Sequence, residues 1–181
     1  MLPLLLLAAC DGAARTPSGT TYKTDTMDAC ILFPPNEAEA FAGEGVAAMS
    51  STLDEMTSSR DPLVCSYNAG TLEEPRLVGL EVRASATPAA AHSRFEGSKS
   101  FLRNLAAGEA QDVPGLGQGA YWVGGSLHQL HVLEGNLVLV VTVQTANAAK
   151  SLYLCKQVVQ RVLNRLHGKP PGDHRRPRVG S

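Results

Sequence analysis

The sequence is poor in several features that would point to a particular class of protein. Charged residues make up 18% of the 181 residues and aromatic residues 5%, and the net charge is −1. A chain so close to neutral is not expected to bind nucleic acid through its overall charge. No apolar run approaches the roughly 20 residues that a membrane-spanning helix needs. The hydrophobic content of 44% is nevertheless enough for the core of one domain.

Sequence signatures of catalysis are also missing, including GxSxG, SxxK and HExxH. The glycines of residues 115–119 follow a predicted helix and precede a predicted strand, the reverse of the order in a dinucleotide-binding GxGxxG turn. His128 and His131 are three positions apart in a predicted strand, so their side chains would point to opposite faces and could not share one metal ion. We therefore expect no catalytic residues, no cofactor and no metal site.

The most informative part of the chain is its N-terminus, MLPLLLLAAC, which ends at Cys10. An apolar run, two alanines and a cysteine are typical of a lipobox, in which the cysteine thiol receives diacylglycerol before the leader is cleaved. We expect residues 1–9 to be a lipoprotein signal peptide and Cys10 to be the lipidated residue. The signal is shorter than the usual 15–30 or so residues, so we expect its true start further upstream. The alternative is an apolar N-terminus with an incidental cysteine.

The chain divides into an anchor, one domain and a tail. Residues 10–28 are rich in Thr, Ser, Gly and Ala, which is typical of a flexible tether. Residues 29–167 are expected to form a single domain. Residues 168–181 carry a net charge of +3 and are expected to be a disordered basic tail, with weak contact to anionic lipid as the alternative. This organisation predicts a lipid-anchored protein on the extracytoplasmic face of the cell membrane.

Three cysteines remain once Cys10 is set aside. Cys155 falls on the apolar face of a predicted helix and is expected to be buried as a free thiol. Cys30 and Cys65 are expected to be bonded to each other, because an oxidising compartment favours disulfides. Zinc is the competing explanation, but no CxxC or paired histidine spacing accompanies these cysteines. A bridge closing this loop of about 35 residues would stabilise the fold by roughly 4 kcal/mol.

Hydrophobic periodicity predicts an α+β fold, in which an antiparallel sheet packs against two or three helices. The last three strands are separated by short glycine-bearing turns and should form a meander. The expected strands are 64–68, 76–85, 120–123, 127–133 and 137–144. The expected helices are one that opens at residues 33–36 and ends at 41, a second over residues 46–56, and two longer ones over 87–108 and 146–166.

One region of the sequence is a candidate binding surface. Tyr121 and Trp122 begin a predicted strand next to the turn that contains Gly115 and Gly117. Core packing is the first explanation for the two aromatic side chains. The alternative is that Trp122, with Tyr121, Gly115 and Gly117, lines a surface for a ligand or partner.

Several short motifs resemble those of a family of uncharacterised secreted lipoproteins of the actinobacterial type. The motifs are Asp28-x-Cys30, Cys65-x-Tyr67, and residues 113–117 (VPGLG) leading into residues 120–122 (AYW), followed by the closing amphipathic helix. The resemblance covers roughly residues 28–166. It implies a PsbP-like α/β sandwich and brings no known catalytic residues with it.

Three functional hypotheses follow. The first is a lipid-anchored extracytoplasmic domain that binds an envelope protein or a small ligand without catalysis. The second is an accessory or assembly subunit of an envelope membrane complex, which predicts an exposed apolar patch around Trp122. The third is a small hydrolase, which predicts a deep pocket where two titratable groups lie within hydrogen-bond reach.

Overall fold

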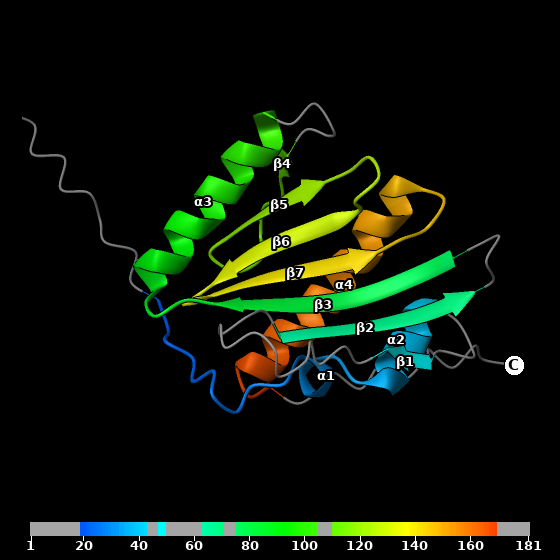
Figure 1. The fold of residues 1–181 in the computed structure, drawn as a ribbon, viewed down its shortest axis with the longest axis horizontal. Helices are drawn as coiled ribbons and strands as arrows, with labels where there is room; N and C mark the ends of the chain where they lie inside the picture. The colour runs from blue at the N-terminus through cyan, green and yellow to red at the C-terminus, as the bar shows by residue number, and fades with distance from the viewer. Residues whose placement is uncertain (1–18, 43–46, 50–62, 71–74, 105–109, 170–181) are drawn as a thin grey trace, which may run out of the picture.

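The computed structural model describes residues 19–42, 47–49, 63–70, 75–104 and 110–169. Its seven strands form one antiparallel sheet in the order β1-β2-β3-β7-β6-β5-β4 (Figure 1). The α+β fold expected from the sequence is thereby confirmed. The strands are β1 (Ala47–Met49), β2 (Leu63–Gly70), β3 (Pro75–Ala84), β4 (Ala110–Asp112), β5 (Gly119–Val123), β6 (Gln129–Glu134) and β7 (Leu137–Val143), and the helices are α1 (Ala29–Leu32), α2 (Pro35–Ala42), α3 (Pro88–Asn104) and α4 (Ala148–Leu166).

Helices cover both faces of the sheet, because alternate residues of the central strands are apolar on each side. On one face, the side chains of Leu80 and Val82 of β3 pack in the larger core, together with α1, α2 and α4. On the other face, Tyr121, Leu133 and Val140 pack in a smaller core under α3. Figure 1 shows α4 behind the strands and α3 beside the half of the sheet that contains β4, β5 and β6.

The long C-terminal helix α4 begins at an asparagine cap and presents one apolar stripe to the sheet. The side chain of Asn147 accepts a hydrogen bond from the backbone N–H of Lys150, at 3.0 Å, which satisfies one of the free donors of the first turn. The helix predicted over residues 146–166 is therefore confirmed, with its first turn displaced by two residues. The stripe buries Cys155, Val158, Val159, Val162 and Leu163.

The first helices are held to the sheet by the predicted disulfide, Cys30–Cys65, which the structure confirms. Cys30 lies inside the short helix α1 rather than before the first helix, because the carboxylate of Asp28 caps that turn by accepting from the Cys30 N–H at 2.7 Å. The Tyr67 hydroxyl donates to the Phe33 carbonyl at 2.6 Å, directly beside the bridge. Residues 29–33 are thus joined to β2 by a covalent bond and a buried hydrogen bond.

One predicted helix is contradicted in part, and one observed strand was not predicted. Residues 47–49 form the edge strand β1, paired with β2, and not part of a helix over residues 46–56. The apolar spacing suggested a helix, but pairing with a neighbouring strand decides the conformation. The rest of that predicted helix lies outside the described residues. The short strand β4, paired with β5, was not expected from the sequence.

The chain before α1 is attached to the sheet. The Tyr22 N–H donates to the Asn136 side chain at 2.7 Å, and the Asn136 amide group donates to the carbonyls of Tyr22 and Ser85 at 3.2 and 3.0 Å. Asn136 also donates its backbone N–H to Thr20. We call residues 19–28 the N-terminal segment. This part of the expected tether is therefore bonded to the turn between β6 and β7.

Several expectations from the sequence concern residues that the structure does not describe. Residues 1–18, which include the expected signal peptide and Cys10, are not described, and neither are residues 170–181 of the expected tail. Of the helices that the structure does describe, none combines the length and the apolar run needed to cross a bilayer.

Candidate binding cleft

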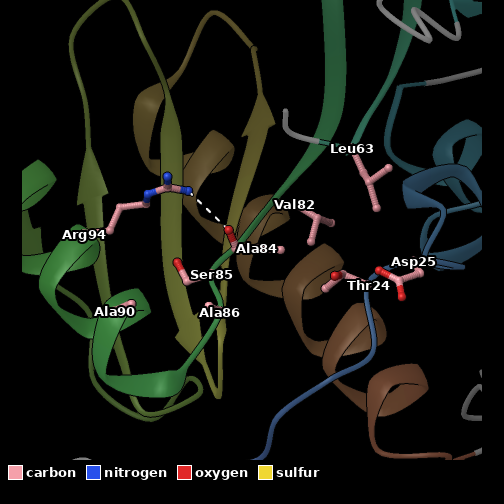
Figure 2. A pocket seen from close by; sticks show the side chains of 9 residues that line it. All are labelled: Thr24, Asp25, Leu63, Val82, Ala84, Ser85, Ala86, Ala90 and Arg94. Carbon is pink, nitrogen blue, oxygen red and sulfur yellow. Dashed lines mark hydrogen bonds between the residues drawn. The ribbon is translucent and has the colours of Figure 1, made fainter. Parts of the chain in front are cut away.

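An open cleft of about 620 Å³ lies where β3 ends and α3 begins (Figure 2). Four parts of the chain form it: the N-terminal segment, the first residue of β2, the end of β3 with the loop that follows, and the first turns of α3. Its size is within the range of small-molecule sites, roughly 300–1,000 Å³. The lining residues are Thr24, Asp25, Leu63, Val82, Ala84, Ser85, Ala86, Ala90 and Arg94.

The cleft has an apolar floor with charged groups on opposite walls. Leu63, Val82 and Ala84 supply apolar surface in the middle, and Figure 2 shows Arg94 on the α3 side and Asp25 on the side of the N-terminal segment. The Arg94 guanidinium donates to the Ala84 carbonyl at 3.4 Å, which directs it along the end of β3. An apolar surface with a few convergent polar groups is the usual form of a ligand site.

The residues of this cleft were not identified from the sequence. Thr24 and Asp25 fall within the expected tether, and Arg94 is an exposed residue of a predicted helix. Nothing in the local pattern distinguishes them, because the cleft forms only when Asn136 holds the N-terminal segment against the β6–β7 turn. The sequence feature that could have indicated the cleft is the hydrogen-bonding capacity of the turn at Gly135 and Asn136. This feature alone is a weak indication of a cleft.

The aromatic residues of the sequence-based candidate surface are buried. Trp122 is 5% exposed and packs in the larger core, whereas Tyr121 is fully buried in the smaller core on the other face. The two side chains point to opposite sides of the sheet because they are neighbours in β5. Core packing is therefore their role in this structure, and neither side chain forms the exposed patch that the second hypothesis expects.

The two glycines of that candidate surface shape the loop between β4 and β5. Both have positive φ, +82° for Gly115 and +53° for Gly117. A Cβ atom at Gly117 would overlap the Leu133 carbonyl oxygen, whereas one at Gly115 would meet nothing within 4 Å. Gly117 is thus required for the close approach of the loop to β6.

A serine and a histidine lie within hydrogen-bond reach at the start of α4, but they do not form an accessible nucleophile. Ser151 Oγ is 3.2 Å from His128 Nδ1, and it also accepts from the Thr145 N–H at 3.1 Å. The Ser151 side chain is completely buried, so a substrate could not reach its hydroxyl. The His128 ring stacks on Trp122 and its backbone has φ +47°. The pair joins the loop before β6 to the first turn of α4.

His128 precedes β6 instead of lying within it, so the strand predicted over residues 127–133 begins two residues later, at Gln129. The two histidines are nevertheless on opposite faces, as expected. His131 stacks on Tyr121, with ring centroids 4.6 Å apart, whereas His128 lies beside Trp122. Within the described residues, no cluster of three or more His, Cys, Asp or Glu residues is arranged to hold a metal ion.

His131 is the most unusual polar residue of the core. It is 3% exposed, and neither ring nitrogen has a hydrogen-bond partner among the described residues. Burial, reinforced by the positive charge of Arg83, lowers the pKa of His131 to about 3. Burial likewise raises the pKa of Tyr121 to about 12, and its hydroxyl also lacks a partner within the described part of the chain. The imidazole is therefore neutral at physiological pH.

Comparison of the chain with protein families, with curated proteins and with solved structures gives no match. The candidate site is therefore argued from its own geometry. The cleft and the His131–Tyr121 pair differ in one decisive respect. The cleft is open to solvent and has charged groups at its walls, whereas the aromatic pair is enclosed under α3.

Proposed function

We propose that this protein is a lipid-anchored, extracytoplasmic binding domain that holds a small ligand in the cleft between the N-terminal segment and α3. The observation that carries the binding function is the cleft itself, with its apolar floor and its charged walls. Of the two classes of ligand that the sequence left open, an open cleft of this size favours a small ligand over an envelope protein.

The absence of catalysis is part of the proposal. The cleft is lined by a guanidinium, a carboxylate and two hydroxyl groups, and its lining contains no histidine and no cysteine. Ser151 and His128 do lie within hydrogen-bond reach of each other, but the serine is buried. A hydrolase of the serine or cysteine type would need an exposed nucleophile with a base beside it, so binding is the better-supported function.

The proposed location rests on the lipobox-like N-terminus and is supported by the disulfide. Bridges such as Cys30–Cys65 persist in oxidising compartments and are rare in the cytosol. The lipoprotein family suggested by the sequence motifs, with Cys10 as the acylated residue, belongs to this proposal. The anchor would hold the domain at the outer face of the cell membrane.

Acylation can be tested by labelling cells with radioactive palmitate. The wild-type protein should incorporate the label and sediment with membranes, whereas Cys10→Ala should lose the label and enter the soluble fraction. Cys155→Ala is the matched control, because that thiol is buried in the domain and should not affect labelling. Unchanged membrane association of Cys10→Ala would contradict the proposed anchor.

Ligand binding can be tested with a pair of variants on adjacent residues of α3. Ala90 lines the cleft and Ala89 does not, and both are exposed. In an NMR screen of small fragments against the full-length protein, hits should shift the amide signals of Ala84, Ser85 and Ala90. Ala90→Trp should abolish these shifts by filling the cleft, and Ala89→Trp should keep them. If the fragments that bind leave the amide signals of these cleft residues unshifted, the result would contradict the proposal.

A further inference from the structure

Three buried polar atoms under α3 have no hydrogen-bond partner within the described part of the chain. They are the Tyr121 hydroxyl oxygen and both ring nitrogens of His131. The Phe95 ring of α3 packs on Tyr121, with ring centroids 4.9 Å apart, and Tyr121 stacks on His131. A buried polar group without a partner lowers stability, whereas water would satisfy it. The pair therefore gains hydrogen bonds whenever α3 moves away and water enters.

Helix α3 is weakly held to the sheet for its length. Of its 17 residues, only Ala91 and Phe95 are buried, and Leu102 is partly buried. The 19-residue helix α4 buries six residues. An element that buries little apolar surface opens at a lower cost in free energy than the whole fold. We therefore expect α3 to leave the sheet in a local opening while α4 stays packed.

The surroundings of His131 oppose its protonation as long as α3 is in place. Burial, reinforced by the positive charge of Arg83, lowers the pKa of the imidazole to about 3. The strand β5 adds only the neutral Tyr121 to this face, and β7 adds no titratable group. The charged groups around the pair are Arg83 and Glu81 of β3, which bond to each other, Glu96 and Lys99 of α3, and Asp112 of β4, which bonds to Lys99. Once α3 opens, water replaces the burial and the imidazole regains its ordinary affinity for protons.

The first turns of α3 both cover this pair and form one wall of the cleft. Ala90 and Arg94 line the cleft, and Figure 2 shows both on the α3 side. The residues that follow each of them, Ala91 and Phe95, pack in the smaller core. Movement of these turns away from the sheet would therefore uncover His131 and remove a wall of the cleft in one step.

We infer that α3 is an acid-sensitive cover: proton uptake by His131 favours a state in which the first turns of α3 leave the sheet and the cleft loses one wall. The proton comes from solvent and binds the unprotonated ring nitrogen, and both N–H groups of the imidazolium then donate to water. The release of α3 goes beyond the proposed function, and only its effect on a bound ligand rests on that function.

Hydrogen exchange of the backbone amides in the full-length protein in detergent measures this release. The pKa of the His131 imidazole is about 3 under α3 and 6.5 in water, so the equilibrium constant for opening should rise about 70-fold between pH 7 and about pH 4.5. After correction for the intrinsic exchange rate at each pH, the protection of the α3 amides should fall by this factor. At both pH values the α3 amides should be less protected than those of α4, because α3 opens without global unfolding.

Two histidine variants assign the response to one ring. His131→Leu should keep the protection of the α3 amides constant over this pH range, because leucine binds no proton. His92→Gln is the matched control, because His92 is an exposed residue of α3, and it should show the same fall of about 70-fold as the wild type.

An equal fall in protection in the wild type and His131→Leu would overturn the inference. Equal protection of the α3 and α4 amides in the wild type, which requires no variant, would overturn it as well, because α3 would then open only with the whole fold. The exchange is measured without ligand, so failure of the proposed function is distinguishable. If α3 responds to acid but no fragment binds in the cleft, the cover stands and the binding function fails. If fragments bind in the cleft but α3 does not respond, only the cover is wrong.

Discussion

Acidification from pH 7 to about 4.5 should lower the free energy of unfolding of the domain, in part through the buried imidazole of His131. The variant His131→Leu should not show the part of this decrease that is due to His131. The ring is 3% exposed, stacks on Tyr121 and lies near the positive charge of Arg83. These surroundings oppose protonation in the folded state. Leucine is close in size to histidine and brings no polar atom into the core, so the variant should fold.

The sign and size follow from the two pKa values of His131. The pKa is 6.5 in the reference state and about 3 in the fold, so below pH 6.5 the unfolded chain binds a proton that the folded protein does not. Stability from this residue is therefore fully present above the unfolded pKa and falls as the pH is lowered. At 1.36 kcal/mol per pH unit, the loss between pH 7 and about pH 4.5 is about 2.5 kcal/mol.

Urea unfolding at a series of pH values measures this loss. Trp122 is the single tryptophan of the chain and is buried in the larger core, so its fluorescence reports global unfolding. The free energy of unfolding of His131→Leu should fall by about 2.5 kcal/mol less than that of the wild type over this range. His92→Gln is the control, because His92 is exposed on α3, and it should behave as the wild type does.

Equal acid sensitivity of the wild type and His131→Leu would refute the reasoning. It would mean that the imidazole of His131 takes up a proton in the folded protein at an ordinary pKa. A loss that also disappears in His92→Gln would point to a different cause, outside the core under α3.

Two further predictions concern covalent and conformational constraints. Replacing Cys30 and Cys65 together by alanine should lower the free energy of unfolding by about 4 kcal/mol, since the bridge closes a 35-residue loop, and urea unfolding should show a lower midpoint. A smaller loss than about 2 kcal/mol would argue that the unfolded chain is already compact. Gly115→Ala should cost about 1–2 kcal/mol for its positive φ. Gly117→Ala should cost more in thermal unfolding, because its Cβ would also meet the Leu133 carbonyl, and equal costs would contradict the close approach.

The sequence predicts the elements whose own residues determine them. The period of the apolar residues identifies α4, and glycine-bearing turns delimit the meander of β5, β6 and β7. The strand β1 could not be recognised, because the spacing of its apolar residues also fits a helix and only the pairing with β2 selects the extended form. The four-residue helix α1 is too short to give a periodic signal.

The cleft could not be predicted for a different reason. Its walls come from residues far apart in the chain, Asp25 and Arg94, and they are brought together by the hydrogen bonds of Asn136 to the N-terminal segment. Trp122 drew attention as a rare aromatic residue next to glycines, but alternation along β5 places it in the core. The chemically distinctive residue Trp122 is thus a packing residue, whereas ordinary polar residues form the candidate site.

If Cys10 is acylated as proposed, the attachment of the N-terminal segment to the sheet would limit how far the cleft can lie from the membrane. Gly19 lies against the β6–β7 turn and close to Pro88, the first residue of α3, which is two residues after the cleft residue Ala86. Under the proposed acylation of Cys10, the chain between Cys10 and Gly19 can extend by at most about 30 Å. The cleft-bearing end of the domain would then sample only a shallow zone above the lipid headgroups. Its ligands would have to be produced, or delivered, within that zone.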